Sequence, residues 1–118
     1  MQTPTTAIIL KALDGLSARA EAIAENIANA GTPGYRPLRV SFEAALAQAV
    51  TEGKAAVDGV EPRLERTSGS GSGTGLRLDM ELAAASSTAT RYAALIEVLN
   101  RQSQRDAVAV SGSGSGGF

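Results

Sequence analysis

The chain has 118 residues, a formal net charge of −1 and no cysteine or histidine, and it holds only two Phe, two Tyr and no Trp. The length suits one domain, but the scarcity of large side chains predicts a thin core. The charge leaves no electrostatic surface for nucleic acid, the missing cysteines exclude disulfides and thiolate chemistry, and the apolar runs fall well short of the roughly 18 residues of a membrane span.

The first predicted element is an amphipathic helix from about Thr6 to Ala30. Pro4, Thr5 and Thr6 favour a helix start, because proline fits the first turn and threonine hydroxyls can cap free N–H groups. Gly15 inside this helix costs up to ~1 kcal/mol relative to alanine. Apolar residues recur at alternating spacings of four and three, which predicts a coiled-coil seam. The residues of this N-terminal seam are Ile9, Leu13, Leu16, Ala20, Ile23, Ile27 and Ala30.

A fixed turn is predicted to follow this helix. Gly31 can take the left-handed conformation that often ends a helix. Residues 32–35, Thr-Pro-Gly-Tyr, fit a type II turn, in which proline takes the second position and Gly34 supplies the positive φ of the third. Asn26 and Asn29 share one face of the last helical turns, where their amides can either cap local carbonyls or bind a neighbouring chain.

The middle of the chain contains a short predicted helix and then loses its pattern. Ser41 is the expected N-cap of the short helix and Gly53 its stop, with Phe42, Leu46 and Ala49 on one side. Residues 54–75 end in a Ser-Gly tract and are expected to form a flexible connector. Within them, residues 60–66 can form a short strand.

A second long helix is predicted from about Asp79 to Val108, and the same heptad rhythm returns in it. This C-terminal seam weakens toward its end, because serine and aspartate pack poorly in an apolar seam. The Ser-Gly tail, residues 111–118, is expected to be mobile. The seam residues are Leu82, Ala85, Ala89, Tyr92, Ile96, Leu99, Ser103, Asp106 and Val110, with Leu95 beside them. The fold class predicted is all-α, with the long terminal helices paired as a coiled coil in one domain, residues 1–118.

Few residues offer catalysis or cofactor binding. Two pairs of acidic residues, Glu21 with Glu25 and Asp79 with Glu81, are expected on solvated helix faces because no bulky apolar residues surround them. The glycine-rich tract 69–75 lacks the lysine and the spacing of a phosphate loop. No catalytic residue, cofactor site or metal site is predicted. Two alanine-lined helices cover each other poorly, so neighbouring subunits are expected to complete the seams.

The segment AENIANAGTPGYRP, residues 24–37, resembles the N-terminal signature of bacterial flagellar axial proteins, the rod and hook subunits. In that family a helix ends in Ala-Asn-x-x-Thr-Pro-Gly-Tyr, and the spacing here matches. The sequences FEAAL, LRLDMEL and RYAALIEVLNRQ further along the chain also resemble the family. The signature residues are Asn26, Asn29, Thr32, Pro33, Gly34 and Tyr35. The short chain is most similar to the proximal rod members.

The resemblance implies a structural subunit of the proximal flagellar rod, located in the periplasm and assembled helically through its seams to transmit torque. It implies further copies of itself, other rod proteins, the adaptor between rod and membrane ring, and the flagellar type III export apparatus as partners. It implies no nucleic acid and no membrane insertion. Export by that apparatus would explain why residues 1–6 lack the features of a cleavable signal peptide. The alternatives are a cytoplasmic coiled-coil adaptor or export chaperone and, less favoured, a small cell-wall enzyme.

Overall fold

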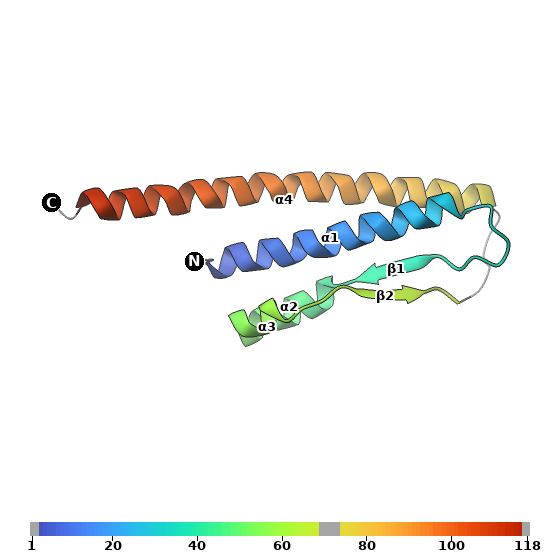
Figure 1. Cartoon of the computed structure of the whole chain (residues 1–118), viewed down its shortest axis with the longest axis horizontal. Helices are drawn as coiled ribbons and strands as arrows, with labels where there is room; N and C mark the ends of the chain where they lie inside the picture. The colour runs from blue at the N-terminus through green and yellow to red at the C-terminus, as the bar shows by residue number, and fades with distance from the viewer. Residues whose placement is uncertain (1–2, 69–73, 117–118) are drawn as a thin grey trace.

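The computed structural model describes residues 3–68 and 74–116. Two long helices, one at each end of the chain, lie side by side (Figure 1). The short elements, which come between them in sequence, pack against one flank of the N-terminal helix. This arrangement confirms the predicted pairing of long terminal helices. The elements are α1 (Pro4–Ala28), β1 (Leu38–Ser41), α2 (Glu43–Glu52), α3 (Lys54–Asp58), β2 (Arg63–Arg66) and α4 (Thr74–Gly116).

Helix α1 starts and ends two residues earlier than expected. Thr3 is its N-cap, and the Thr3 hydroxyl accepts a hydrogen bond from the backbone N–H of Thr6 at 3.1 Å. Pro4 occupies the first turn, where its missing N–H costs nothing. The sequence signals were therefore correct, but the cap is the threonine before the proline rather than those after it.

Helix α4 is longer than expected at both ends. It begins at Thr74 instead of Asp79 and continues to Gly116, through most of the tail for which the sequence predicts mobility. Extending an existing helix needs no new nucleus, so residues of weak helix propensity can follow a stable helix. Its 43 residues span roughly 65 Å, and Figure 1 shows α4 running past the N-terminus of α1.

The mostly helical fold also contains a small two-stranded hairpin. Strands β1 and β2 pair antiparallel, with Val40 opposite Leu64. The first part of the predicted connector, residues 54–75, contains α3 and β2, and β2 falls within the short strand expected at residues 60–66. Residues 69–73 fall outside the described structure. The expected N-cap Ser41 is the last residue of β1, and Phe42 caps α2 without a side-chain hydrogen bond. Burial of the Phe42 ring takes precedence over capping at this position.

The hydrophobic core lies on the flank of α1 that faces the short elements. Helix α1 forms a middle layer, with α4 on one side and β1, α2 and α3 on the other (Figure 1). Much of the apolar surface of α1 that the sequence assigned to neighbouring subunits is thus covered within the chain itself. The buried cluster contains Ala7, Leu16, Ala22, Val40, Phe42, Leu46, Ala49 and Val57.

Packing explains why a glycine occupies position 15 inside α1, which the sequence pattern alone does not. A Cβ atom built on Gly15 would overlap the buried ring of Phe42. The glycine therefore leaves the space in which the one large aromatic residue of the core lies against α1.

Replacing Gly15 with alanine is expected to destabilise the fold by about 1 to 3 kcal/mol, because the Phe42 ring must move out of a packed site. An ordinary helix position would show the opposite sign, a gain of about 1 kcal/mol. Urea unfolding followed by circular dichroism measures the change. Gly59→Ala is the control, since a Cβ there meets only ordinary contacts. A stabilised Gly15→Ala variant would contradict this packing.

A charged pair joins α1 to the start of α2. The Arg19 guanidinium donates two hydrogen bonds to the Glu43 carboxylate at 2.6 and 2.8 Å, and a third at 2.7 Å to the carbonyl of Val40. It also lies 4.9 Å from the centre of the Phe42 ring. The hydrogen bonds from Arg19 lower the pKa of Glu43 from 4.5 to about 2. This pair stabilises the fold while Glu43 is ionised.

The stabilisation by Glu43 should be present above about pH 4.5 and decline as the pH falls toward 2, because its pKa is lower in the folded chain than in the unfolded chain. The difference in unfolding free energy between wild type and Glu43→Gln is thus expected to shrink between pH 5 and pH 2. Because Glu43 is half exposed, the difference at pH 7 should be modest. Glu61→Gln, on an exposed loop residue, serves as the control. A difference that stays constant down to pH 2 would refute this role of the pair.

Candidate functional site

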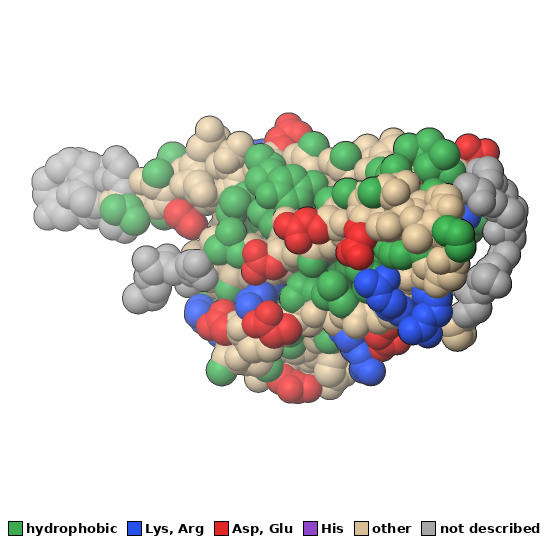
Figure 2. Space-filling view, turned by 45° about the vertical axis from the view of Figure 1, so that its right-hand side comes forward, with side chains coloured by type: hydrophobic (Ala, Val, Ile, Leu, Met, Phe, Trp, Pro, Cys, Tyr) green, Lys and Arg blue, Asp and Glu red, His purple; other side chains and the backbone are tan. Residues whose placement is uncertain are grey.

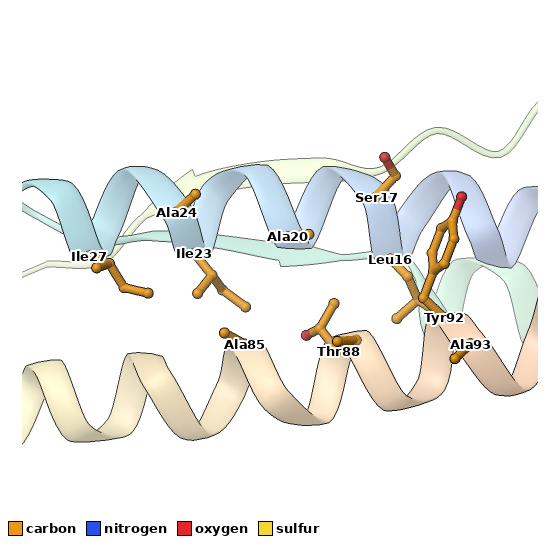
Figure 3. Close-up of a pocket in the computed structure, with 11 residues that line it drawn as sticks. Leu16, Ser17, Ala20, Ile23, Ala24, Ile27, Ala85, Thr88, Tyr92 and Ala93 are labelled. Carbon is orange, nitrogen blue, oxygen red and sulfur yellow. The ribbon is translucent and has the colours of Figure 1, made fainter.

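An open apolar groove runs between α1 and α4 (Figure 3). Its volume is about 450 Å³. In Figure 3, Leu16, Ile23 and Ile27 of α1 point toward α4, and the Tyr92 ring rises from α4 beside Leu16. Several lining residues are alanines, whose small side chains leave the space between the helices unfilled. Residues of both predicted seams line this one groove. We call this surface the helix-pair groove.

The predicted N-terminal seam is mostly buried within the chain. Ile27 is half-buried, Ala20 is exposed at the groove, and Ala30 is buried beyond the end of α1. The sequence pattern therefore identified the inward face of α1 well. The fully buried seam residues within the helix are Ile9, Leu13, Leu16 and Ile23.

The C-terminal seam is less well predicted. Leu82 is 51 % exposed and Tyr92 39 % exposed, whereas Glu81 and Thr88 are buried. The buried stripe of α4 thus lies about one residue N-terminal to the predicted seam at these positions. A polar interaction at Glu81, described below, sets this rotation. Leu95, Ile96 and Leu99 are half-buried, and Val110 is exposed.

The turn after α1 has the predicted geometry at its centre. Gly34 has φ +77°, and the Tyr35 N–H donates to the Thr32 carbonyl at 3.2 Å, as a type II turn requires. Gly31, however, is not left-handed, so that prediction is wrong. Asn29 ends the helix instead: its side-chain amide donates to the Glu25 carbonyl at 3.0 Å. In this chain Asn29 caps locally.

Asn26 has a different role from Asn29, because it lies at the centre of a buried polar network. Its side chain is 1 % exposed. The amide group donates to the Leu38 carbonyl and to the Glu81 carboxylate, both at 2.9 Å. The amide oxygen accepts from the Tyr35 hydroxyl and the Leu38 N–H, both at 2.8 Å. All four contacts are tertiary, so Asn26 joins α1, the turn, β1 and α4.

Glu81 corrects the expectation of a solvated carboxylate. It is 1 % exposed, and its carboxylate accepts hydrogen bonds from Asn26 and, at 3.0 and 3.3 Å, from Arg39. A buried carboxylate needs such partners, because an unpaired charge in the interior is strongly unfavourable. Glu21, Glu25 and Asp79 are exposed, as predicted.

Arg77 holds the same turn from the other side. From the start of α4 its guanidinium donates to the Ala30 carbonyl at 2.7 Å and to the Tyr35 carbonyl at 3.3 Å. These carbonyls lie beyond the end of α1, where no helical partner exists. This role of Arg77 was not predicted, since an arginine that donates hydrogen bonds to carbonyls far away in the chain leaves no local sequence pattern. Thus Arg77 and Glu81 together fix the start of α4 against the turn.

The site therefore consists of a rigid turn at one end of an apolar groove, and it suits packing rather than chemistry. In the described parts of the chain, no cluster of three or more acidic, cysteine or histidine residues could hold a metal ion. None of the helices searched there has the length and hydropathy that would let it cross a membrane. The buried carboxylate of Glu81 is fully engaged by structural partners.

The chain is thus a mostly helical protein, with an extended helix pair, an open apolar groove between the two helices and a hydrogen-bonded turn beyond the end of α1. Residues 10–36, which span most of α1 and the whole turn, match the family described as flagella basal body rod protein. This is a family of structural proteins of the flagellar rod, not of enzymes. Among curated proteins and among solved structures, none matches the chain. The match indicates a structural role in the rod of the basal body.

Proposed function

We propose that this chain is a structural subunit of the proximal rod, which assembles helically with its neighbours into the drive shaft of the flagellum. The observation that carries the proposal is the family match over residues 10–36, the same segment that forms the locked turn and one wall of the helix-pair groove. In the described residues a hairpin and two short helices lie between the long helices in sequence, and this short middle part supports the proximal type.

The mechanism we propose is assembly through many shallow contacts. The helix-pair groove and exposed Leu82 offer apolar surface on the long helices, which neighbouring subunits would cover. Each contact contributes in proportion to the apolar area it removes from water, about 25 cal/mol per Å². The network around Asn26 keeps the turn in one orientation, so that every subunit would present the same surface. Torque can then pass through a repeated and rigid unit.

The partners we propose are further copies of this chain, other rod proteins and the adaptor that joins the rod to the membrane ring. Delivery to the periplasmic rod would use the flagellar type III export apparatus. A coiled-coil adaptor or export chaperone of the cytoplasm is the second candidate, favoured only by the helix pair itself. Such a protein would form discrete oligomers, so a fixed mass in light scattering as concentration rises would favour it over the rod subunit.

The proposal is tested by charging an exposed apolar residue of α4. Leu82→Asp is expected to leave the isolated chain folded, because Leu82 is half exposed, but to abolish motility in a bacterium that lacks the native subunit. Leu64→Asp is the matched control: the same residue type on β2, 53 % exposed, away from the helix pair. Motility assays and basal-body preparations are the readouts. Equal motility with both variants would refute the proposed assembly surface.

A further inference from the structure

The end of α4 extends beyond the helix that it packs against. The contacts from Asn26 to Glu81 and from Ala30 to Arg77 fix the antiparallel register of the two long helices. At this register Pro4 lies level with about residue 103 of α4, given equal rise along both helices. The part of α4 from residue 105 to residue 116 therefore has no α1 beside it (Figure 1). We call it the overhang.

The overhang presents apolar and basic side chains on its described part. Val108 is 70 % exposed and Val110 73 % exposed. Arg105 and Val108 are three residues apart and share a helix face with Arg101, which lies one turn before the overhang. With Gln104 and Ala109 they border a shallow hollow. Val108 therefore gives this face an exposed apolar side chain beside its arginines.

The helix-pair groove has acidic side chains at its edge, which complement the basic side chains of the overhang. Asp14 and Glu21 are exposed on α1, and each is three or four residues from Ser17, which lines the groove. Within the described residues neither Asp14 nor Glu21 forms an ion pair. In Figure 2, acidic side chains lie among the hydrophobic ones that gather along the middle of the molecule. The groove thus combines an apolar floor with carboxylates at its edge.

We propose that the overhang of one copy of this chain docks into the helix-pair groove of a second copy. This inference rests on the proposed rod function and names the contact between successive copies. Residues 16–27 of the groove extend over roughly 17 Å of α1, and the overhang is roughly 18 Å long. Val108 would enter the apolar floor, and Arg105 would meet the carboxylates of Asp14 and Glu21.

The contact joins two different surfaces, so a pair of copies still has one free groove on one copy and one free overhang on the other. Such a heterologous contact continues without closing and builds an open assembly. If successive copies point in the same direction, they are offset by roughly 30 Å, the distance along α4 from the centre of the groove to the centre of the overhang.

The docking contact can be tested in the purified protein with two variants, one that disables the overhang and one that disables the helix-pair groove. Val108→Asp spoils the overhang, and Ala20→Trp fills the groove from an exposed lining position. Sedimentation velocity is expected to show wild type forming oligomers that grow with concentration, and each variant as a monomer. An equimolar mixture of the variants should form a dimer and nothing larger, because one intact overhang and one intact groove remain. Val50→Asp and Ala47→Trp, at exposed positions of α2, should assemble like wild type.

Two results would overturn the docking contact. One is that Val108→Asp or Ala20→Trp alone assembles like wild type, and the other is that the mixture of the two stays monomeric. A wild-type chain that stays monomeric at millimolar concentration would also overturn it, because the occupant proposed is a second copy. The rod function is judged separately by motility: if Leu82→Asp is immotile and Val108→Asp is motile, the docking contact fails while the rod function stands.

Exchanging charges tests the ionic part of the contact. Arg105→Glu and Glu21→Arg should each weaken self-association by roughly tenfold, because each places like charges together across the interface. A chain with both exchanges should regain most of the affinity. Arg63→Glu on the hairpin is the control, since Arg63 lies on β2 and its partner Glu65 is local. Failure of the double exchange to restore association would place the contact elsewhere.

Discussion

Replacing Asn26 with alanine is expected to lower the free energy of unfolding by about 3 to 5 kcal/mol, a large share of the stability of a small domain. The substitution removes four hydrogen bonds. It leaves the Glu81 carboxylate buried beside Arg39 alone, and it leaves the Leu38 N–H without its acceptor. Urea unfolding at neutral pH measures the effect.

Asn29→Ala is the matched control, because it changes the same residue type three positions away. Asn29 makes only local hydrogen bonds, to Glu25 and Thr32, so its loss should cost about 1 kcal/mol. Equal losses in the two variants would contradict the central place of Asn26. Whether Asn29 also contacts a neighbouring subunit is a separate prediction: Asn29→Ala would then fold normally but fail to enter rods.

Ile23→Asp is expected to prevent cooperative folding. Ile23 is buried in the C-terminal half of α1. Aspartate there would lose the packing of a large apolar side chain, which is worth about 2 to 5 kcal/mol, and would carry a charge into the interior. Circular dichroism and thermal unfolding of the dilute chain give the result. Ala24→Asp, at the next and exposed position, should cost less than about 1 kcal/mol, mainly through helix propensity. A folded Ile23→Asp monomer would contradict the burial of this seam residue.

The sequence predicted the elements whose signals are local. The heptad spacing of α1 identified Leu13, Leu16 and Ile23 as inward residues, since a helix face repeats along the chain. The Pro33-Gly34 pair predicted the turn, because each residue restricts its own φ. A short strand was expected within residues 60–66, where β2 lies, but its partner β1 was not. Strand β1 has only four residues, and its pairing joins segments far apart in the chain.

The polar part of the site could not be read from local patterns. Glu81 has the sequence features of a solvated carboxylate, and only its position opposite Asn26 shows why it is buried. By its side chain Ser41 is a better N-cap than Phe42. Helix α2 nevertheless begins after Phe42, because this position buries the Phe42 ring against Gly15. In both cases a tertiary contact outweighs a local preference.

The hydrogen bond between Asn26 and Glu81 joins residues 55 positions apart, and this separation has a consequence for the order of folding. A contact of this kind forms only after a long loop has closed, which costs chain entropy before any stabilisation is gained. In any process that delivers the chain from its N-terminus, synthesis included, α1 and its turn must wait for Glu81 to emerge. Until then Asn26 lacks its carboxylate partner, and the first two thirds of the chain have a low free energy of unfolding.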